Sequence, residues 1–184
     1  MNFLDEAMRI KLREVFQKME EPVSLVLFEN IPECEHCSDT MELLTDLTKL
    51  TPLIHLIHYD IKVEIEKAKK YRADKTPFIS IDKGAAEEPT DLGVHFAGIP
   101  VGHEFSAFIS SILMVSKGKS NLSPETKDYL KNLDHPIDLQ VFSTPTSPLL
   151  STGNFSRAPD GNGKLQGDGD CYRSLGIPGT SPAV

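Results

Sequence analysis

Two cysteines separated by two residues, Cys34 and Cys37, are the side chains of this chain best suited to covalent chemistry. An apolar stretch over residues 23–28 precedes them, and a helical pattern begins at Ser38. At a helix start, unpaired backbone N–H groups and the positive end of the helix dipole favour the thiolate of the first cysteine. Two thiols at this spacing can close a disulfide across one turn, so the motif predicts thiol–disulfide exchange.

A single Cys-x-x-Cys motif is also compatible with a metal site or with two inert thiols. Zinc normally needs two further ligands, and the third cysteine, Cys171, lies far away in a glycine-rich segment. Cys171 forms no Cys/His pair with any of His55, His58, His95, His103 and His135. Metal binding through Cys34, Cys37 and a third ligand therefore stays open as an alternative.

Charged residues surround the cysteine pair. The carboxylates of Glu33, Glu35 and Asp39 disfavour a thiolate, whereas the helix start and a protonated His36 favour it. These opposing effects predict a modest nucleophile at Cys34, unless the charges only solvate an exposed turn. Two further histidines on a predicted strand, His55 and His58, are interpreted as core or edge residues and not as ligands.

The bulk composition limits the classes of function. The 184 residues carry a formal net charge of −8, and no run of Lys and Arg alternates with aromatic residues. Nucleic acid is therefore not expected as a partner. The N-terminus lacks the pattern of a signal peptide, and no apolar run approaches the roughly 20 residues of a membrane span. We expect a cytoplasmic protein that does not act at a membrane.

Hydrophobic periodicity predicts eight elements before residue 118. In chain order they are a helix over 3–19, a strand over 23–28, a helix from the cysteines to about Leu50, a strand over 52–59, a helix over 64–72, strands over 78–81 and 93–96, and a helix over 104–115. The strand over 52–59 is almost continuously apolar, as buried parallel strands are. This βαβ–ββα order predicts an α/β sheet covered by helices on both faces.

A proline, Pro77, follows Thr76 and opens the third predicted strand. Because proline has no N–H to donate to a ladder, it is confined to a strand start or an edge. In the predicted arrangement we expect Pro77 to be a cis-proline that faces the cysteines.

These features together resemble the thioredoxin/glutaredoxin superfamily. Within it, the chain is similar to the glutaredoxin-like protein disulfide oxidoreductases, which carry two thioredoxin units in one chain. The resemblance covers residues 3–148 and includes the segments 70–77, 93–105, 119–135 and 141–146. It departs at Thr76-Pro77-Phe78, where thioredoxins more often have Val-Pro-Thr.

The resemblance implies a thioredoxin-like fold and a thiol–disulfide oxidoreductase that acts on protein disulfides in cell redox homeostasis. It implies that Cys34 attacks, that Cys37 resolves, and that Pro77 with Thr76 lies against the substrate. No metal or organic cofactor is implied, but a dithiol reductase, such as a thioredoxin reductase-like enzyme, must recycle the pair. The alternative is a weakly active or inactive interaction module, because the second unit, which usually holds the main active site, is missing.

The resemblance also divides the chain. It implies a thioredoxin-like domain over 1–118, a linker helix over 119–135 and the start of an incomplete second unit over 136–148. Residues 149–184 lack periodic apolar positions, and seven of the chain's twelve glycines follow residue 150, so we interpret them as a disordered or out-of-frame tail. Where the family has a second Cys-x-x-Cys, this chain has Ser147-Pro148-Leu149-Leu150. Codons shifted by one base from Leu149 can encode Tyr-Cys-Pro-Gln-Ala-Ile, so we hypothesise a one-base frame error near residues 147–148.

Overall fold

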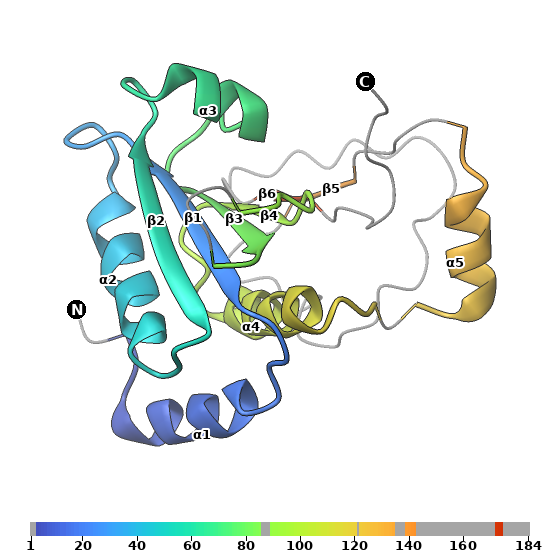
Figure 1. The fold of residues 1–184 in the computed structure, drawn as a ribbon. Helices are drawn as coiled ribbons and strands as arrows, with labels where there is room; N and C mark the ends of the chain where they lie inside the picture. Colours follow the sequence, from blue (N-terminus) through green and yellow to red (C-terminus); the bar gives the residue numbers. More distant parts are fainter. Residues whose placement is uncertain (1–2, 86–88, 121, 135–138, 143–171, 175–184) are drawn as a thin grey trace.

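The computed structural model describes residues 3–85, 89–120, 122–134, 139–142 and 172–174 (Figure 1). Its helices are α1 (Glu6–Phe16), α2 (Cys37–Thr48), α3 (Ile65–Tyr71), α4 (His103–Lys117) and α5 (Pro124–Lys131). Its strands are β1 (Val23–Glu29), β2 (Ile54–Asp60), β3 (Phe78–Lys83), β4 (His95–Ala97), β5 (Gln140–Phe142) and β6 (Tyr172–Ser174). The elements from α1 to α4 occur in the predicted order.

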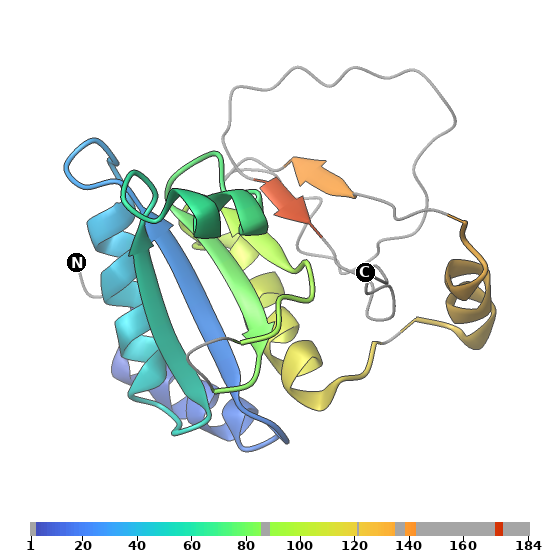
Figure 2. The ribbon, with the colours of Figure 1, turned by 45° about the horizontal axis from the view of Figure 1, so that its top comes forward.

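The strands form one sheet in the order β2-β1-β3-β4-β6-β5. Strand β1 is parallel to β2, with Val23 opposite Ile54, and antiparallel to β3, with Phe28 opposite Phe78. Strand β3 is in turn antiparallel to β4. All residues of β1 are buried, because helices cover this central strand on both faces (Figure 2). The predicted α/β fold with helices on both faces of its sheet is confirmed.

Strand β2 differs from the sequence prediction. It is parallel to β1, as predicted, but it lies at the edge of the sheet and pairs, within the described part of the chain, with β1 alone. His55 and His58 are exposed on it, and its other residues are mostly half-buried. The prediction of a buried strand was wrong, because an apolar run does not reveal whether a second strand pairs on its outer side.

The C-terminal part of the chain is described only in short segments. Helix α5 lies within the predicted linker, and none of its eight residues is buried. Strand β6, which the sequence did not predict, pairs with β4 and β5. The remaining residues of the predicted tail, and the proposed frame error near residues 147–148, lie outside the described residues.

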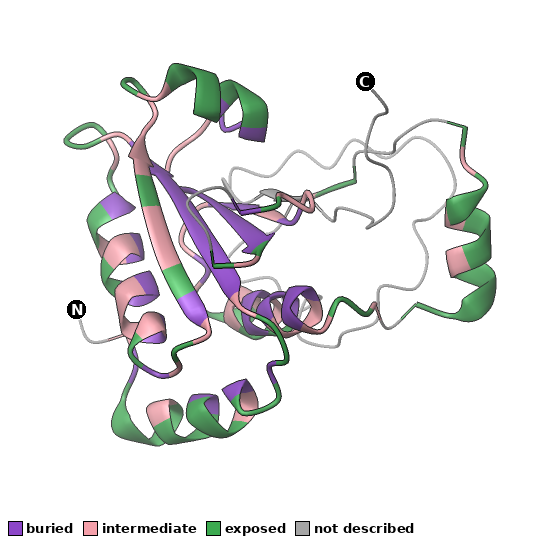
Figure 3. Ribbon diagram, in the orientation of Figure 1, coloured by how far each residue is buried: buried purple, intermediate pink, exposed green. Residues whose placement is uncertain are grey.

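The core consists of two clusters of buried residues, one on each face of the sheet. Figure 3 shows that the buried residues lie on the central strands and along parts of the helices. On one face, Leu25, Leu27, Ile79 and Ile81 pack with apolar residues of α1, α2 and α4. On the other, the packed residues come from β1, α3, the loop after it, β3 and β4: Val26, Phe28, Ala68, Tyr71, Ala73, Phe78 and Ala97. Full burial of a Leu or Phe side chain contributes about 1.5–3 kcal/mol, so both layers stabilise the sheet.

No helix in the described part of the chain is both long enough and apolar enough to cross a membrane.

Candidate active site

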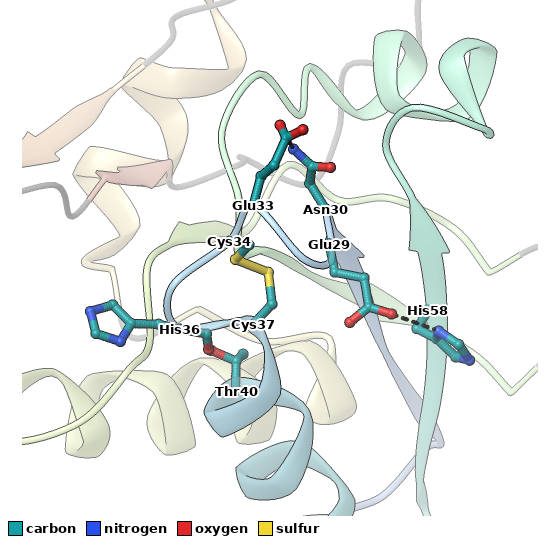
Figure 4. The surroundings of a disulfide bond; sticks show 8 residues. All are labelled: Glu29, Asn30, Glu33, Cys34, His36, Cys37, Thr40 and His58. Carbon is teal, nitrogen blue, oxygen red and sulfur yellow. Dashed lines mark hydrogen bonds and ion pairs between the residues drawn. A yellow bond between two sulfur atoms is a disulfide. The ribbon is translucent and has the colours of Figure 1, made fainter.

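The two cysteines of the motif form a disulfide, with a distance of 5.5 Å between their Cα atoms (Figure 4). Cys34 is half-buried, whereas Cys37 is fully buried. The predicted pairing is therefore present, and a reactant from solvent meets Cys34 first.

The turn that carries Cys34 connects β1 to α2. The Cys34 N–H donates to the carbonyl oxygen of Asn30 at 2.9 Å, and α2 begins at Cys37 with His36 as its N-cap. The sequence predicted a helical pattern from Ser38, so α2 begins one residue earlier than predicted, and the Cys34 N–H is not part of its first turn. The backbone N–H groups of the first turn nevertheless lie next to the disulfide, since Cys37 is the first residue of α2 and its sulfur is bonded to that of Cys34.

The proline predicted to face the cysteines lies at the same end of the sheet. The Thr76–Pro77 peptide bond is cis, as predicted, and Pro77 is buried while Thr76 is half-buried. The Gly98 N–H donates to the Pro77 carbonyl oxygen at 2.8 Å, which fixes this carbonyl to the end of β4. Because Phe28 is opposite Phe78, Pro77 lies at the end of β1 from which the cysteine turn departs.

A lysine that the sequence could not place lies beside the cysteine turn. The Lys62 Nζ donates to the Glu33 Oε1 at 2.7 Å, and the Asn30 side chain donates to Glu33 Oε2 at 3.2 Å. The hydrogen bonds from Lys62 and Asn30 and the charge of Lys62 lower the pKa of Glu33. Both members of the ion pair are exposed, so solvent weakens their interaction.

A buried carboxylate near the cysteine pair, that of Glu29, was not predicted from the sequence (Figure 4). Glu29 ends β1 and is buried, and its Oε1 lies 3.2 Å from Nδ1 of His58 (Figure 4). Its Oε2 is buried and has no hydrogen-bond partner among the described residues. The available signal was a single charged residue at the end of an otherwise apolar strand, next to the motif.

Other predicted residues have simpler surroundings. Glu35 and His36 are exposed and Asp39 is half-buried. His55 and His58 are edge histidines, and His58 contacts Glu29. Within the described residues, no group of three or more His, Cys, Asp or Glu side chains is placed to hold a metal ion. Cys171 lies outside the described residues.

No family model matches the chain. The chain is 27% identical over 143 residues to the AhpF component of alkyl hydroperoxide reductase in Staphylococcus aureus, and 25% identical over 139 residues to the same component in Pseudomonas aeruginosa. These alignments cover 78% and 76% of this chain but only 25% and 23% of the relatives. The chain thus spans about a quarter of the length of these curated proteins.

Solved structures give the same picture. A protein disulfide oxidoreductase from Aeropyrum pernix superposes with a TM-score of 0.68 at 26% identity, over 78% of this chain and 61% of that one. The NTD_N/C domain of alkylhydroperoxide reductase AhpF from Enterococcus faecalis superposes with a TM-score of 0.69 at 24% identity, over 78% of this chain and 67% of that one. The fold, the Cys-x-x-Cys pair and these relatives identify the chain as a member of the thioredoxin/glutaredoxin superfamily, and they support thiol–disulfide oxidoreductase chemistry.

Proposed function

We propose that this thioredoxin-like chain is a protein disulfide oxidoreductase in which Cys34 is the attacking thiol and Cys37 the resolving thiol. The observation that carries the proposal is the Cys34–Cys37 disulfide with one half-exposed and one buried sulfur-bearing residue, at the N-terminus of a helix. Similarity to a protein disulfide oxidoreductase over 78% of this chain supports it.

The proposed reaction transfers two electrons from the cysteine pair to a substrate disulfide. The Cys34 thiolate attacks one sulfur of that disulfide, forms a mixed disulfide and releases the other sulfur as a thiolate, which takes up a proton. The Cys37 thiolate then attacks the Cys34 sulfur and releases the second substrate thiolate. The substrate ends as two thiols and the pair as the Cys34–Cys37 disulfide.

Thr76 and Pro77 are the proposed substrate contact. They lie at the end of the sheet from which the cysteine turn departs, and their loop is held to β4 through the Pro77 carbonyl. A substrate segment that reaches Cys34 is therefore expected to lie along this loop.

The proposed partners are proteins with accessible disulfides and a dithiol reductase that reduces the Cys34–Cys37 pair after each cycle. Their general kind follows from the relatives, which by name are a component of a hydroperoxide reductase and a disulfide oxidoreductase. We place the reaction in the cytoplasm, where such reductases keep thiols reduced.

Reduction of insulin disulfides by the full chain, with dithiothreitol as the electron source, tests this function. Cys34→Ser should lower the rate to that of dithiothreitol alone, whereas Cys171→Ser, outside the pair, should behave as the unmodified chain. An unmodified chain that adds nothing to the dithiothreitol rate contradicts the proposal. Stoichiometric zinc in such an inactive chain, purified under reducing conditions, would support the metal-binding alternative.

A further inference from the structure

A second group of polar side chains lies inside the molecule, on the face of the sheet that α3 covers. Its members are Tyr71, Ser80, Asp82, Asp91 and His95, and they come from α3, β3, the following loop and β4. Ser80 and Asp82 are fully buried, although β3 is otherwise apolar up to its last residue. The proposed reaction uses none of these residues.

Hydrogen bonds connect the members of this polar network. The Tyr71 hydroxyl donates to Asp82 Oδ2 at 2.7 Å, and the Ser80 hydroxyl donates to Asp82 Oδ1. The Oδ1 atom of Asp91 lies 3.0 Å from Nε2 of His95 and accepts a hydrogen bond from the Gly93 N–H at 2.6 Å. Each carboxylate therefore has at least two hydrogen-bonding partners, as buried charges require.

The electrostatics agree with this geometry. Burial raises the pKa of Asp82 to about 6, against the opposing hydrogen bonds from Ser80 and Tyr71. Burial, together with the bond to Asp82, raises the pKa of Tyr71 well above its usual range, so its hydroxyl stays a donor. Burial acts to raise the pKa of Asp91, but this pKa is lowered overall by its hydrogen-bonding partners, first His95 and then Gly93, and by the charge of His95.

The Tyr71–Asp82 hydrogen bond spans the proposed substrate loop. Tyr71 is five residues before Thr76, and Asp82 is five residues after Pro77. Helix α3 ends at Tyr71, Arg72 follows in the left-handed conformation with φ of 54°, and the Ala73 N–H donates to the Ala68 carbonyl at 2.9 Å. The loop thus leaves a closed helix end and enters β3, and the side-chain hydrogen bond joins these two elements.

Aromatic packing also connects Tyr71 to β1, the strand that leads to the cysteines. The ring centroid of Phe28 lies 5.2 Å from that of Tyr71 and 6.0 Å from that of Phe78, which directly follows Pro77. Phe28 is also the residue before Glu29, where β1 ends and the chain turns toward Cys34. Tyr71 therefore contacts β1, which leads to the cysteines, and through Asp82 it contacts β3, which begins directly after Pro77.

We propose that Tyr71 and Asp82 are positioning residues, whose hydrogen bond holds the Thr76–Pro77 loop where it contacts a substrate disulfide. The role of this loop in binding a substrate rests on the proposed function. The restraint of the loop by the Tyr71–Asp82 hydrogen bond does not. Removal of the hydroxyl should loosen the loop while leaving the chemistry of the Cys34 sulfur unchanged.

Tyr71→Phe tests this inference, with Tyr59→Phe as the matched control. Tyr59 belongs to the same aromatic group, and its ring centroid lies 5.6 Å from that of Phe28. The tyrosine hydroxyl that donates to Asp82, however, is that of Tyr71. Amide hydrogen exchange over residues 73–76 of the oxidised full chain should accelerate about fivefold or more in Tyr71→Phe, the factor expected for loss of one buried hydrogen bond, and stay unchanged in Tyr59→Phe. Equal exchange in the two variants overturns the inference.

The same variants separate the inference from the proposed function. In insulin reduction, Tyr71→Phe should raise KM about fivefold with little change in kcat, while alkylation of reduced Cys34 by iodoacetamide keeps its rate. Asp82→Asn retains an acceptor for the Tyr71 hydroxyl and should keep slow exchange, whereas Asp82→Leu should not. If the unmodified chain reduces no insulin, the proposed function fails, and the exchange experiment still decides whether the restraint exists.

Discussion

The cysteine turn and the polar network on the α3 face use charged side chains in opposite ways. Around Cys34 the charged groups of Glu33, Glu35 and Lys62 are exposed, and solvent reaches both members of the Lys62–Glu33 pair. In the network the carboxylate of Asp82 is fully buried and held by hydroxyl groups. Exposed charges adjust reactivity weakly and in a salt-dependent way, whereas buried ones are expensive to leave unpaired and so determine position.

The largest expected effect concerns the asymmetry within the cysteine turn itself. In Cys37→Ser the first attack still occurs, but the resolving thiolate is missing, so the mixed disulfide on Cys34 should accumulate and turnover should fall to the background rate. Non-reducing gel electrophoresis after incubation with oxidised insulin detects this adduct. Limiting iodoacetamide on the reduced chain should label Cys34 before the buried Cys37. The reverse order of labelling would exchange the two roles.

The buried side of the comparison predicts a pH dependence of stability. The pKa of Asp82 in the fold, about 6, is above the value of about 3.9 for an unfolded chain. Proton binding therefore favours the folded state: this contribution is complete below about pH 4 and is lost as the pH rises through 6. Relative to Asp82→Asn, the unmodified chain should lose about 2 kcal/mol of unfolding free energy between pH 4 and pH 7.

Urea denaturation of both proteins across this pH range measures the difference. Asp91 has a lowered pKa and contributes with the opposite sign, since its stabilisation is lost as the pH falls, but it is present in both proteins. A difference that stays constant with pH would mean that Asp82 is not a buried titrating group.

A smaller effect on stability is expected at the contact between a buried and an exposed charged side chain, Glu29 and His58. The carboxylate of Glu29 is buried. Among the described residues its Oε1 has the exposed His58 as its partner, and its Oε2 has none. His58→Ala should lower the free energy of unfolding by about 1–2 kcal/mol, because it removes this partner from a buried carboxylate. His55→Ala, a substitution of an exposed histidine on the same strand, should change it by less than about 0.5 kcal/mol. Equal effects of the two substitutions would exclude a specific role of His58.

The sequence predicted the cysteine turn better than the buried polar network on the α3 face. The cysteine spacing, the proline before β3 and the order of elements are local patterns, and each was found where it was predicted. The network depends on tertiary pairing: no spacing rule joins Tyr71 to Asp82, and Asp82 reads from the sequence as the end of a strand. Likewise, the register of β1 and β2 brings Glu29 to His58, and the loop after β2 brings Lys62 to Glu33. These contacts join residues far apart in the chain, which single-sequence periodicity does not encode.

The smallest expected effect concerns the exposed ion pair beside Cys34. Lys62→Met leaves the Glu33 carboxylate without its cation, one residue from the attacking sulfur, so the thiolate should be less favoured. Since both groups are exposed, alkylation of reduced Cys34 by iodoacetamide at pH 7 should slow by less than about threefold, with no measurable change in stability. The effect should vanish in 1 M salt, where the screening length is about 3 Å. Glu33→Gln combined with Lys62→Met should restore the rate, because the uncompensated charge is gone. A slow double variant would show that Lys62 acts on Cys34 directly and not through Glu33.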